Sequence, residues 1–139
     1  MYDKPMLGLD HVQKAMSIML AKANEEPDRP LAFAIVDDVG DLVSYARMDR
    51  CRKIPQRMAV GKAHTCALTG QDSKDYAERL PSHGRTVAEM DDPMLAAVQG
   101  GLVVLQPGTG SIMGGIGVSG LAAQEDEDIA RMGLQALGL

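Results

Sequence analysis

The sequence has no tryptophan and few other aromatic residues, since three tyrosines and one phenylalanine make up 3% of the chain. Single-stranded nucleic acid is bound largely on stacked aromatic side chains, and duplexes are bound by a basic surface. The formal net charge is −5, and the one basic cluster, between residues 47 and 57, is interrupted by Asp49. The composition therefore argues against a nucleic-acid partner and favours a local site for a small anion.

Long apolar runs and a secretion signal are also missing. No run approaches the about 20 residues that span a bilayer, and the first ten residues lack the basic-then-apolar layout of a signal peptide. The two cysteines, Cys51 and Cys66, have no C-x-x-C spacing and suit reduced, buried thiols. We expect one cytoplasmic domain over residues 1–139, without a membrane partner.

Histidines are scarce, and their spacing excludes the common metal motifs. His11, His64 and His83 lie far apart and never at i, i+4, so no zinc site is expected. Haem is less demanding, because a single axial His, Met, Cys or Tyr suffices. His11 and His64 are therefore candidate ligand-binding residues, against the alternative that each is an ordinary surface or core histidine.

Hydrophobic periodicity predicts an α+β fold. Segments with the helical period of hydrophobic residues predict helices, and short segments that are apolar throughout or at every second residue predict strands. Their order along the chain is α-β-β-α, short helices, β-β-α. Because hairpins join neighbouring strands, the sheet should be antiparallel and flanked by the long helices. The expected helices cover residues 10–23, 55–69 and 122–137, and the expected strands cover 31–38, 41–49, 101–106 and 111–120, with a polar stretch over 71–98.

The glycine-rich segment 115–120 matches G-x-G-x-x-G and leads into the last helix. A dinucleotide fold is excluded, because only 19 residues follow Gly120 and they leave no room for a second strand. Glycines still allow close approach of a ligand, and amides at the helix start can bind a carboxylate. Gly117, Ser119 and Gly120 are therefore candidate ligand-binding residues.

Three charged residues form a second candidate site. Arg47 can hold a carboxylate through two hydrogen bonds, Lys62 can transfer a proton or form an imine once its pKa is lowered by burial, and Asp49 can orient either. The competing interpretation is a salt bridge at a strand end and a solvated helix lysine. Acidic residues 125–128 at the start of the last helix are explained by the helix dipole.

Two blocks of the sequence, AIVDDVGDLVSYARMD with AVGKAHTCA and GGLVVLQPGTGSIMGGIGVSGLAAQEDEDIARMGLQAL, resemble the GlcG/HbpS family of haem-binding-like proteins. This family also includes the C-terminal domain of PduO-type proteins. The resemblance implies a profilin-like antiparallel sheet flanked by helices, a homo-oligomer, and haem as a candidate cofactor. The family pattern falls on Asp37, Gly40, Arg47, Met48, Asp49, Lys62, Ala63, Gly115, Gly117, Val118, Ser119, Gly120, Asp126 and Ala130.

Two departures from the family pattern bear on the pocket. His64 stands where the family commonly has another residue, and Leu-Val-Val follows Gly101 where the family usually has apolar-Pro-Ile. The missing proline helps to shape the pocket rim in the family.

Three functional hypotheses follow. The first is a small-molecule-binding protein that holds haem or another, anionic ligand between sheet and helices, with His64 or His11 as axial ligand. The alternative is a metal-independent isomerase, hydratase or lyase in organic acid catabolism, in which Arg47 binds the substrate carboxylate and Lys62 or Asp49 moves the proton. An oligomeric scaffold without chemistry is a third.

Overall fold

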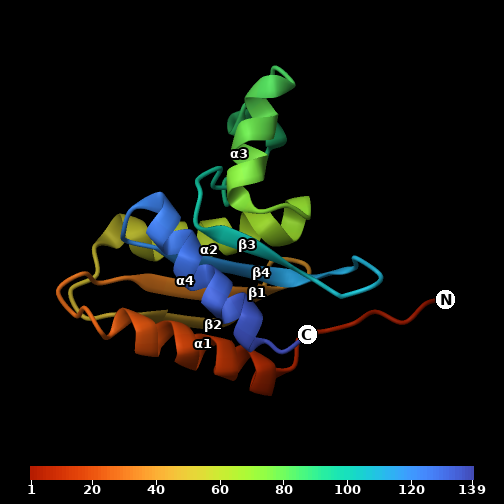
Figure 1. Ribbon diagram of the computed structural model, residues 1–139. Helices are drawn as coiled ribbons and strands as arrows, with labels where there is room; N and C mark the ends of the chain where they lie inside the picture. The colour runs from red at the N-terminus through yellow and green to blue at the C-terminus, as the bar shows by residue number, and fades with distance from the viewer.

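A four-stranded antiparallel sheet in the order β2-β1-β4-β3 organises the protein, in a computed structural model that describes residues 1–139. In Figure 1, α1 and α4 cross one face of the sheet, α2 lies behind it and α3 projects beyond its edge. The expected α+β fold, an antiparallel sheet flanked by helices in one domain, is confirmed. The strands are β1 Ala32–Asp37, β2 Leu42–Arg47, β3 Gly101–Leu105 and β4 Ile112–Ser119; the helices are α1 Leu9–Ala23, α2 Lys53–Thr69, α3 Ser73–Ser82 and α4 Ala123–Ala136, with a 3₁₀ turn at Val87–Met90.

Strand β1 is buried on both faces, which explains its nearly continuous apolar sequence. Phe33 and Ile35 point into the larger core, which α1 and α4 cover. Ala32, Ala34 and Val36 point to the other face, where they pack against the alanines of α2. The alternating side chains of one strand thus contribute to two separate cores.

Small residues bring α2 unusually close to the sheet. A methyl group on Gly117 would collide with the carbonyl oxygen of Ala59, and one on Gly115 would collide with that of Ala63. The two glycines of β4 therefore leave the space that the helix backbone fills. Because α2 lies this close, a long side chain on its flank can reach past the sheet to the other layer.

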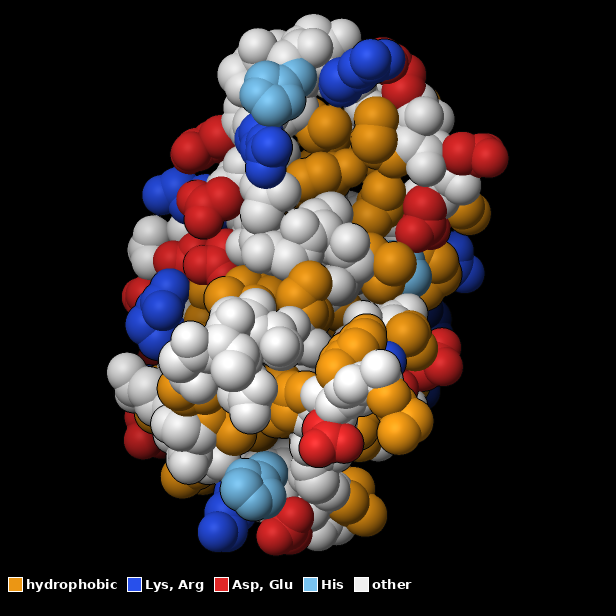
Figure 2. Space-filling model, turned by 90° about the vertical axis from the view of Figure 1, so that its right-hand side faces the viewer, with side chains coloured by type: hydrophobic (Ala, Val, Ile, Leu, Met, Phe, Trp, Pro, Cys, Tyr) orange, Lys and Arg blue, Asp and Glu red, His pale blue; other side chains and the backbone are white.

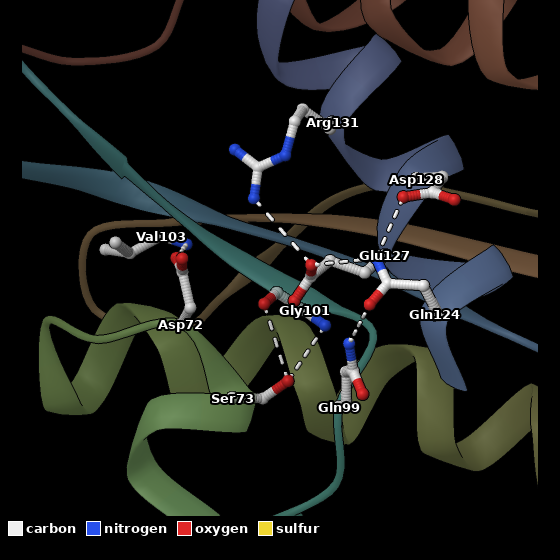
Figure 3. A network of polar contacts seen from close by, with 9 residues as sticks. All are labelled: Asp72, Ser73, Gln99, Gly101, Val103, Gln124, Glu127, Asp128 and Arg131. Atoms are coloured by element: carbon white, nitrogen blue, oxygen red, sulfur yellow. Dashed lines mark hydrogen bonds and ion pairs between the residues drawn. The ribbon is translucent and has the colours of Figure 1, made fainter.

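Strand β3 is an edge strand, and the start of α3 covers its outer side. Figure 3 shows Asp72 accepting a hydrogen bond from the Val103 amide at 3.0 Å. Ser73 Oγ accepts one from the Gly101 amide at 2.8 Å. These bonds satisfy backbone groups that no fifth strand pairs, and they fix the position where β3 begins.

Candidate functional site

A cavity of about 480 Å³ lies where the N-termini of α2 and α4 meet the end of β4. Lys62 and Asp126 line it together with Ser119 and Gly120. We call this space the Lys62 cavity. Its lining also includes Arg52, Lys53, Ile54, Pro55, Met58, Val98, Gln99, Leu121 and Ala123.

Lys62 and Asp126 form a buried ion pair in the wall of this cavity. Their side chains are 2% and 3% exposed, and Lys62 Nζ donates to Asp126 Oδ2 at 3.2 Å. Nζ also donates to the Val118 carbonyl oxygen at 2.9 Å, while Asp126 Oδ1 accepts from the Leu121 amide at 2.9 Å. Each charge is therefore hydrogen-bonded as well as paired, which a buried ion pair requires.

Gly100 makes room for this pair. Its φ is +126°, and a methyl group on it would lie 2.6 Å from Lys62 Nζ and 2.8 Å from the Val118 carbonyl oxygen. Only glycine combines this backbone conformation with the absence of a side chain. Gly100 therefore leaves the space through which the amine reaches Asp126.

Burial opposes both charges of the pair. Burial lowers the pKa of the Lys62 amine, and the neighbouring Asp126 carboxylate raises it in part. Burial likewise raises the pKa of the Asp126 carboxyl, against the effect of Lys62 and of the Leu121 and Gly120 amides. An ammonium has three N–H donors, and the two acceptors named above use two of them.

Two helix N-termini and two cationic side chains border the mouth of the cavity, beside the carboxylate of Asp126. Helix α2 begins at Lys53 and α4 at Ala123, and the residues before them, Arg52 and Ala122, form no side-chain cap. The first amides of a helix have no partner within the helix, and the dipole adds positive charge there. Since Arg52 and Lys53 also line the cavity, this end of the molecule suits an anionic group.

The first turn of α4 is held in place from the neighbouring segment. Gln99, which lines the cavity, donates from Nε2 to Gln124 Oε1 at 3.1 Å, and Gln124 also donates to Asp128 at 2.9 Å. Figure 3 shows this chain of contacts running from the segment before β3 to α4. One wall of the cavity is thereby tied to the helix that supplies Asp126.

The structure brings together only part of the predicted site. Lys62, Ser119 and Gly120 line one cavity, while Gly117 is buried beneath α2. Arg47 and Asp49 line a separate depression of about 320 Å³ and form no ion pair with each other. The interpretation of Lys62 as a solvated helix lysine is wrong, because its partner Asp126 lies on a helix of the opposite layer.

Both candidate histidines lie outside the Lys62 cavity. His64 Nε2 is 2.8 Å from Asp92 Oδ2, and this contact holds the segment after α3 against α2. His11 Nδ1 is 2.8 Å from the Leu137 carbonyl oxygen, on the α1 side of the sheet. No group of three or more His, Cys, Asp or Glu side chains is arranged to hold a metal ion. None of the helices has the length and apolar character needed to cross a membrane.

A second hollow of about 600 Å³ adjoins the Lys62 cavity and shares Met58 with it. Tyr45 of β2, Arg57 of α2 and Met94 line this space, which we call the Tyr45 groove. Arg57 belongs to the basic cluster in which a local anion site was expected, whereas Tyr45 and Met94 carry no such signal in the sequence. Thr65 Oγ1, which accepts from the Ala96 amide at 2.7 Å, holds the outer wall in place.

Comparison with known proteins agrees with the fold and with the resemblance seen in the sequence. The sequence model of the family described as "Haem degrading protein HbpS-like" matches residues 7–135. Protein GlcG of Escherichia coli (strain K12) is 34% identical over 110 residues, which are 77% of this chain and 79% of that protein.

Solved structures share the whole fold. A double mutant of Streptomyces reticuli HbpS superposes with a TM-score of 0.86 at 26% identity and covers 100% of this chain and 92% of its own. A complex of PduOC with haem has a TM-score of 0.82 at 20% identity and covers 95% of each chain. From its sequence and its fold, this chain belongs to the HbpS-like family.

Proposed function

We propose that this protein binds a small organic anion in the Lys62 cavity. The observation that carries the proposal is the convergence of two uncapped helix N-termini, with Arg52 and Lys53, on one cavity. Amides and cationic side chains bind a carboxylate through charge-assisted hydrogen bonds. Ser119 and Gly120, which line the same space, lie within the segment expected to approach a ligand.

The alternative of an isomerase, hydratase or lyase built on Arg47, Asp49 and Lys62 is not favoured. Its carboxylate clamp, Arg47, lies in a different depression from Lys62 and donates from Nη1 to Gln56 Oε1 at 2.6 Å. A clamp and a proton-transfer group must face the same substrate. This arrangement separates them.

A calorimetric titration with lactate tests the anion proposal. We expect Arg52→Gln/Lys53→Gln to weaken binding about tenfold or more, because each charge-assisted hydrogen bond contributes about 1.5–3 kcal/mol. Lys74→Gln/Arg85→Gln removes the same charge from the α3 region and is the matched control. If both double variants weaken lactate binding equally, the effect arises from the net charge of the protein rather than from Arg52 and Lys53, and the proposal is contradicted.

Haem, the ligand that the family description names, fits the Tyr45 groove better than the Lys62 cavity. Axial ligands of haem are His, Met, Cys or Tyr, and Met58 is the only such side chain that lines the Lys62 cavity. The groove offers Tyr45, Met58 and Met94 as donors, with Arg57 for a propionate. If haem were bound there, Tyr45, Met58 or Met94 would hold it, and the iron would supply redox chemistry.

An absorbance titration with haemin tests the haem proposal. We expect a saturable Soret change that Tyr45→Phe or Met58→Leu alters and that His11→Ala leaves unchanged. His64→Ala is the critical comparison, because His64 lies outside the groove and its ring contacts Asp92. Loss of the Soret change in His64→Ala alone would transfer the ligand role to His64 and contradict the assignment to Tyr45 or Met58.

We also propose that copies of the chain associate through the surface around the Tyr45 groove. Leu42 and Met94, which line the groove, are 53% and 47% exposed, and Ile54, which lines the adjoining Lys62 cavity, is 73% exposed. Figure 2 shows hydrophobic side chains gathered between scattered charges on one face of the molecule. Large exposed apolar patches mark interaction sites. Sedimentation of the wild type and of Ile54→Glu should show an oligomer that the variant weakens.

A further inference from the structure

Lys62 is the only buried lysine of this chain, because the other five are exposed. Its amine lies in the wall of a cavity rather than inside a sealed core. Nζ meets two acceptors, and the backbone of Gly100 passes close beside it. The ion pair with Asp126 accounts for Gly100 but not for the cavity that adjoins the amine.

Buried lysines beside a carboxylate are suited to carbonyl chemistry. A desolvated amine gives up its proton more readily and becomes nucleophilic, and lysines of this kind form imines with carbonyl compounds. Asp126 Oδ2, at 3.2 Å from Nζ, is placed to take that proton and to return it. The lowered pKa of the Lys62 amine agrees with this geometry.

The mouth of the cavity selects the carbonyl compound. The uncapped helix N-termini and Arg52 bind a carboxylate, as argued above, while Lys62 lies in the wall. A small molecule that carries both a carboxylate and a carbonyl group satisfies both, and 2-oxo acids are the smallest compounds of this kind. We propose that Lys62 captures a small 2-oxo acid reversibly as a protonated imine, an inference that rests on anion binding in the same cavity.

The step balances without any further reagent. The Lys62 ammonium gives a proton to the Asp126 carboxylate, and the free amine attacks the carbonyl carbon to form a C–N bond. A second proton moves from nitrogen to the former carbonyl oxygen. Asp126 then protonates the hydroxyl group, the C–O bond breaks and water leaves. The product is a protonated imine that remains paired with the Asp126 carboxylate.

Reductive trapping tests the proposal. The protein is incubated with pyruvate and cyanoborohydride, which reduces an imine to a stable secondary amine, and the modified lysines are located by peptide mass spectrometry. We expect Lys62 to be modified at least tenfold faster than Lys53, which lies at the exposed mouth, and Lys74, which lies on α3. Lys62→Arg keeps the positive charge and should lose the rapid labelling, and Asp126→Asn should slow it.

Labelling of Lys62 no faster than Lys53 and Lys74 overturns the imine proposal. Lactate separates this failure from a failure of the proposed function, because it carries the carboxylate but no carbonyl group. If lactate binds and pyruvate is not trapped, the cavity binds anions without covalent capture. If neither compound binds or reacts, both proposals are wrong.

Discussion

Lys62 and Asp126 are 64 positions apart in the sequence and meet at 3.2 Å, although their helices cover opposite faces of the sheet. The contact exists because α2 lies close on the glycines of β4 and because Gly100 leaves a passage at the start of β3. The sequence pattern of either helix, taken alone, does not predict this contact. The pair joins the two layers of the protein at the wall of its candidate binding site.

The first prediction concerns the stability that this pair provides. Asp126→Ala leaves a buried ammonium with only the Val118 carbonyl oxygen as acceptor, so we expect a loss of about 3–5 kcal/mol. Lys62→Met should also destabilise the protein, because it leaves the buried Asp126 carboxyl without its partner. Urea denaturation at neutral pH measures both variants. The double variant Lys62→Met/Asp126→Ala should lose less than the sum of the single losses, and strict additivity would contradict a direct interaction.

The second prediction isolates the role of Gly100. Gly100→Ala places a methyl group 2.6 Å from Lys62 Nζ at a φ of +126°, so we expect a loss of more than about 2 kcal/mol together with weaker lactate binding. Gly84→Ala is the matched control, since Gly84 also has a positive φ, of +66°, but nothing within 4 Å of the added methyl group. The control should lose only the strain of about 1–2 kcal/mol. Equal losses in the two variants would show that backbone strain alone explains Gly100.

Much of the fold follows from local patterns in the sequence. The apolar run of β1 predicts a strand buried on both faces, and Ala59, Ala63 and Ala67 predict a helix face that packs closely on the sheet. Such patterns are visible because strands and helices repeat over a few residues. Gly70 ends α2 in the left-handed conformation that glycine favours.

The site was only partly predictable, because it depends on contacts between distant segments. Helical periodicity places Lys62 on the flank of α2. It cannot show that Asp126, on α4 at the opposite face of the sheet, lies within contact distance of the amine. The helix dipole already accounts for an acidic residue at position 126. The sequence therefore gives no separate signal that Asp126 pairs with Lys62, although the family pattern includes both residues. Arg47 and Lys62 were predicted to form one site because of their charges. Arg47 lies at the end of β2 and Lys62 on the flank of α2, so their side chains line different cavities.

The third prediction concerns pH. His64 holds the pKa of the Asp92 carboxyl below its usual range, chiefly through the side-chain hydrogen bond between them. The unfolded chain therefore binds more protons than the folded one in this range, so the pair stabilises the protein above about pH 4 and the effect is lost as the pH falls further. Denaturant titrations between pH 6 and pH 3 should show a shallower decline for Asp92→Asn than for the wild type. Identical slopes would mean that Asp92 is not linked to folding.

The fourth prediction concerns the reactivity of Cys66. Burial raises the pKa of this thiol to about 12, with a smaller contribution from Asp72 and a partial reduction by hydrogen bonding with Ser73. Because the thiolate is the reactive species, alkylation by iodoacetamide near pH 8 should be about 10³-fold slower in the folded protein than after unfolding in urea. Mass spectrometry of the modified peptides measures the two rates separately for Cys66 and Cys51.

Alkylation of the Ser73→Ala variant tests whether α3 protects Cys66 from the reagent. Removal of Ser73 Oγ breaks the hydrogen bonds to Gly101, so the start of α3 should separate from β3 more often and expose Cys66. We expect faster alkylation of Cys66 in this variant and an unchanged rate at Cys51, which lies in the connection between β2 and α2. A rate at Cys66 that Ser73→Ala does not change would show that α3 is not what protects this thiol, and a rapid reaction in the folded wild type would contradict its burial.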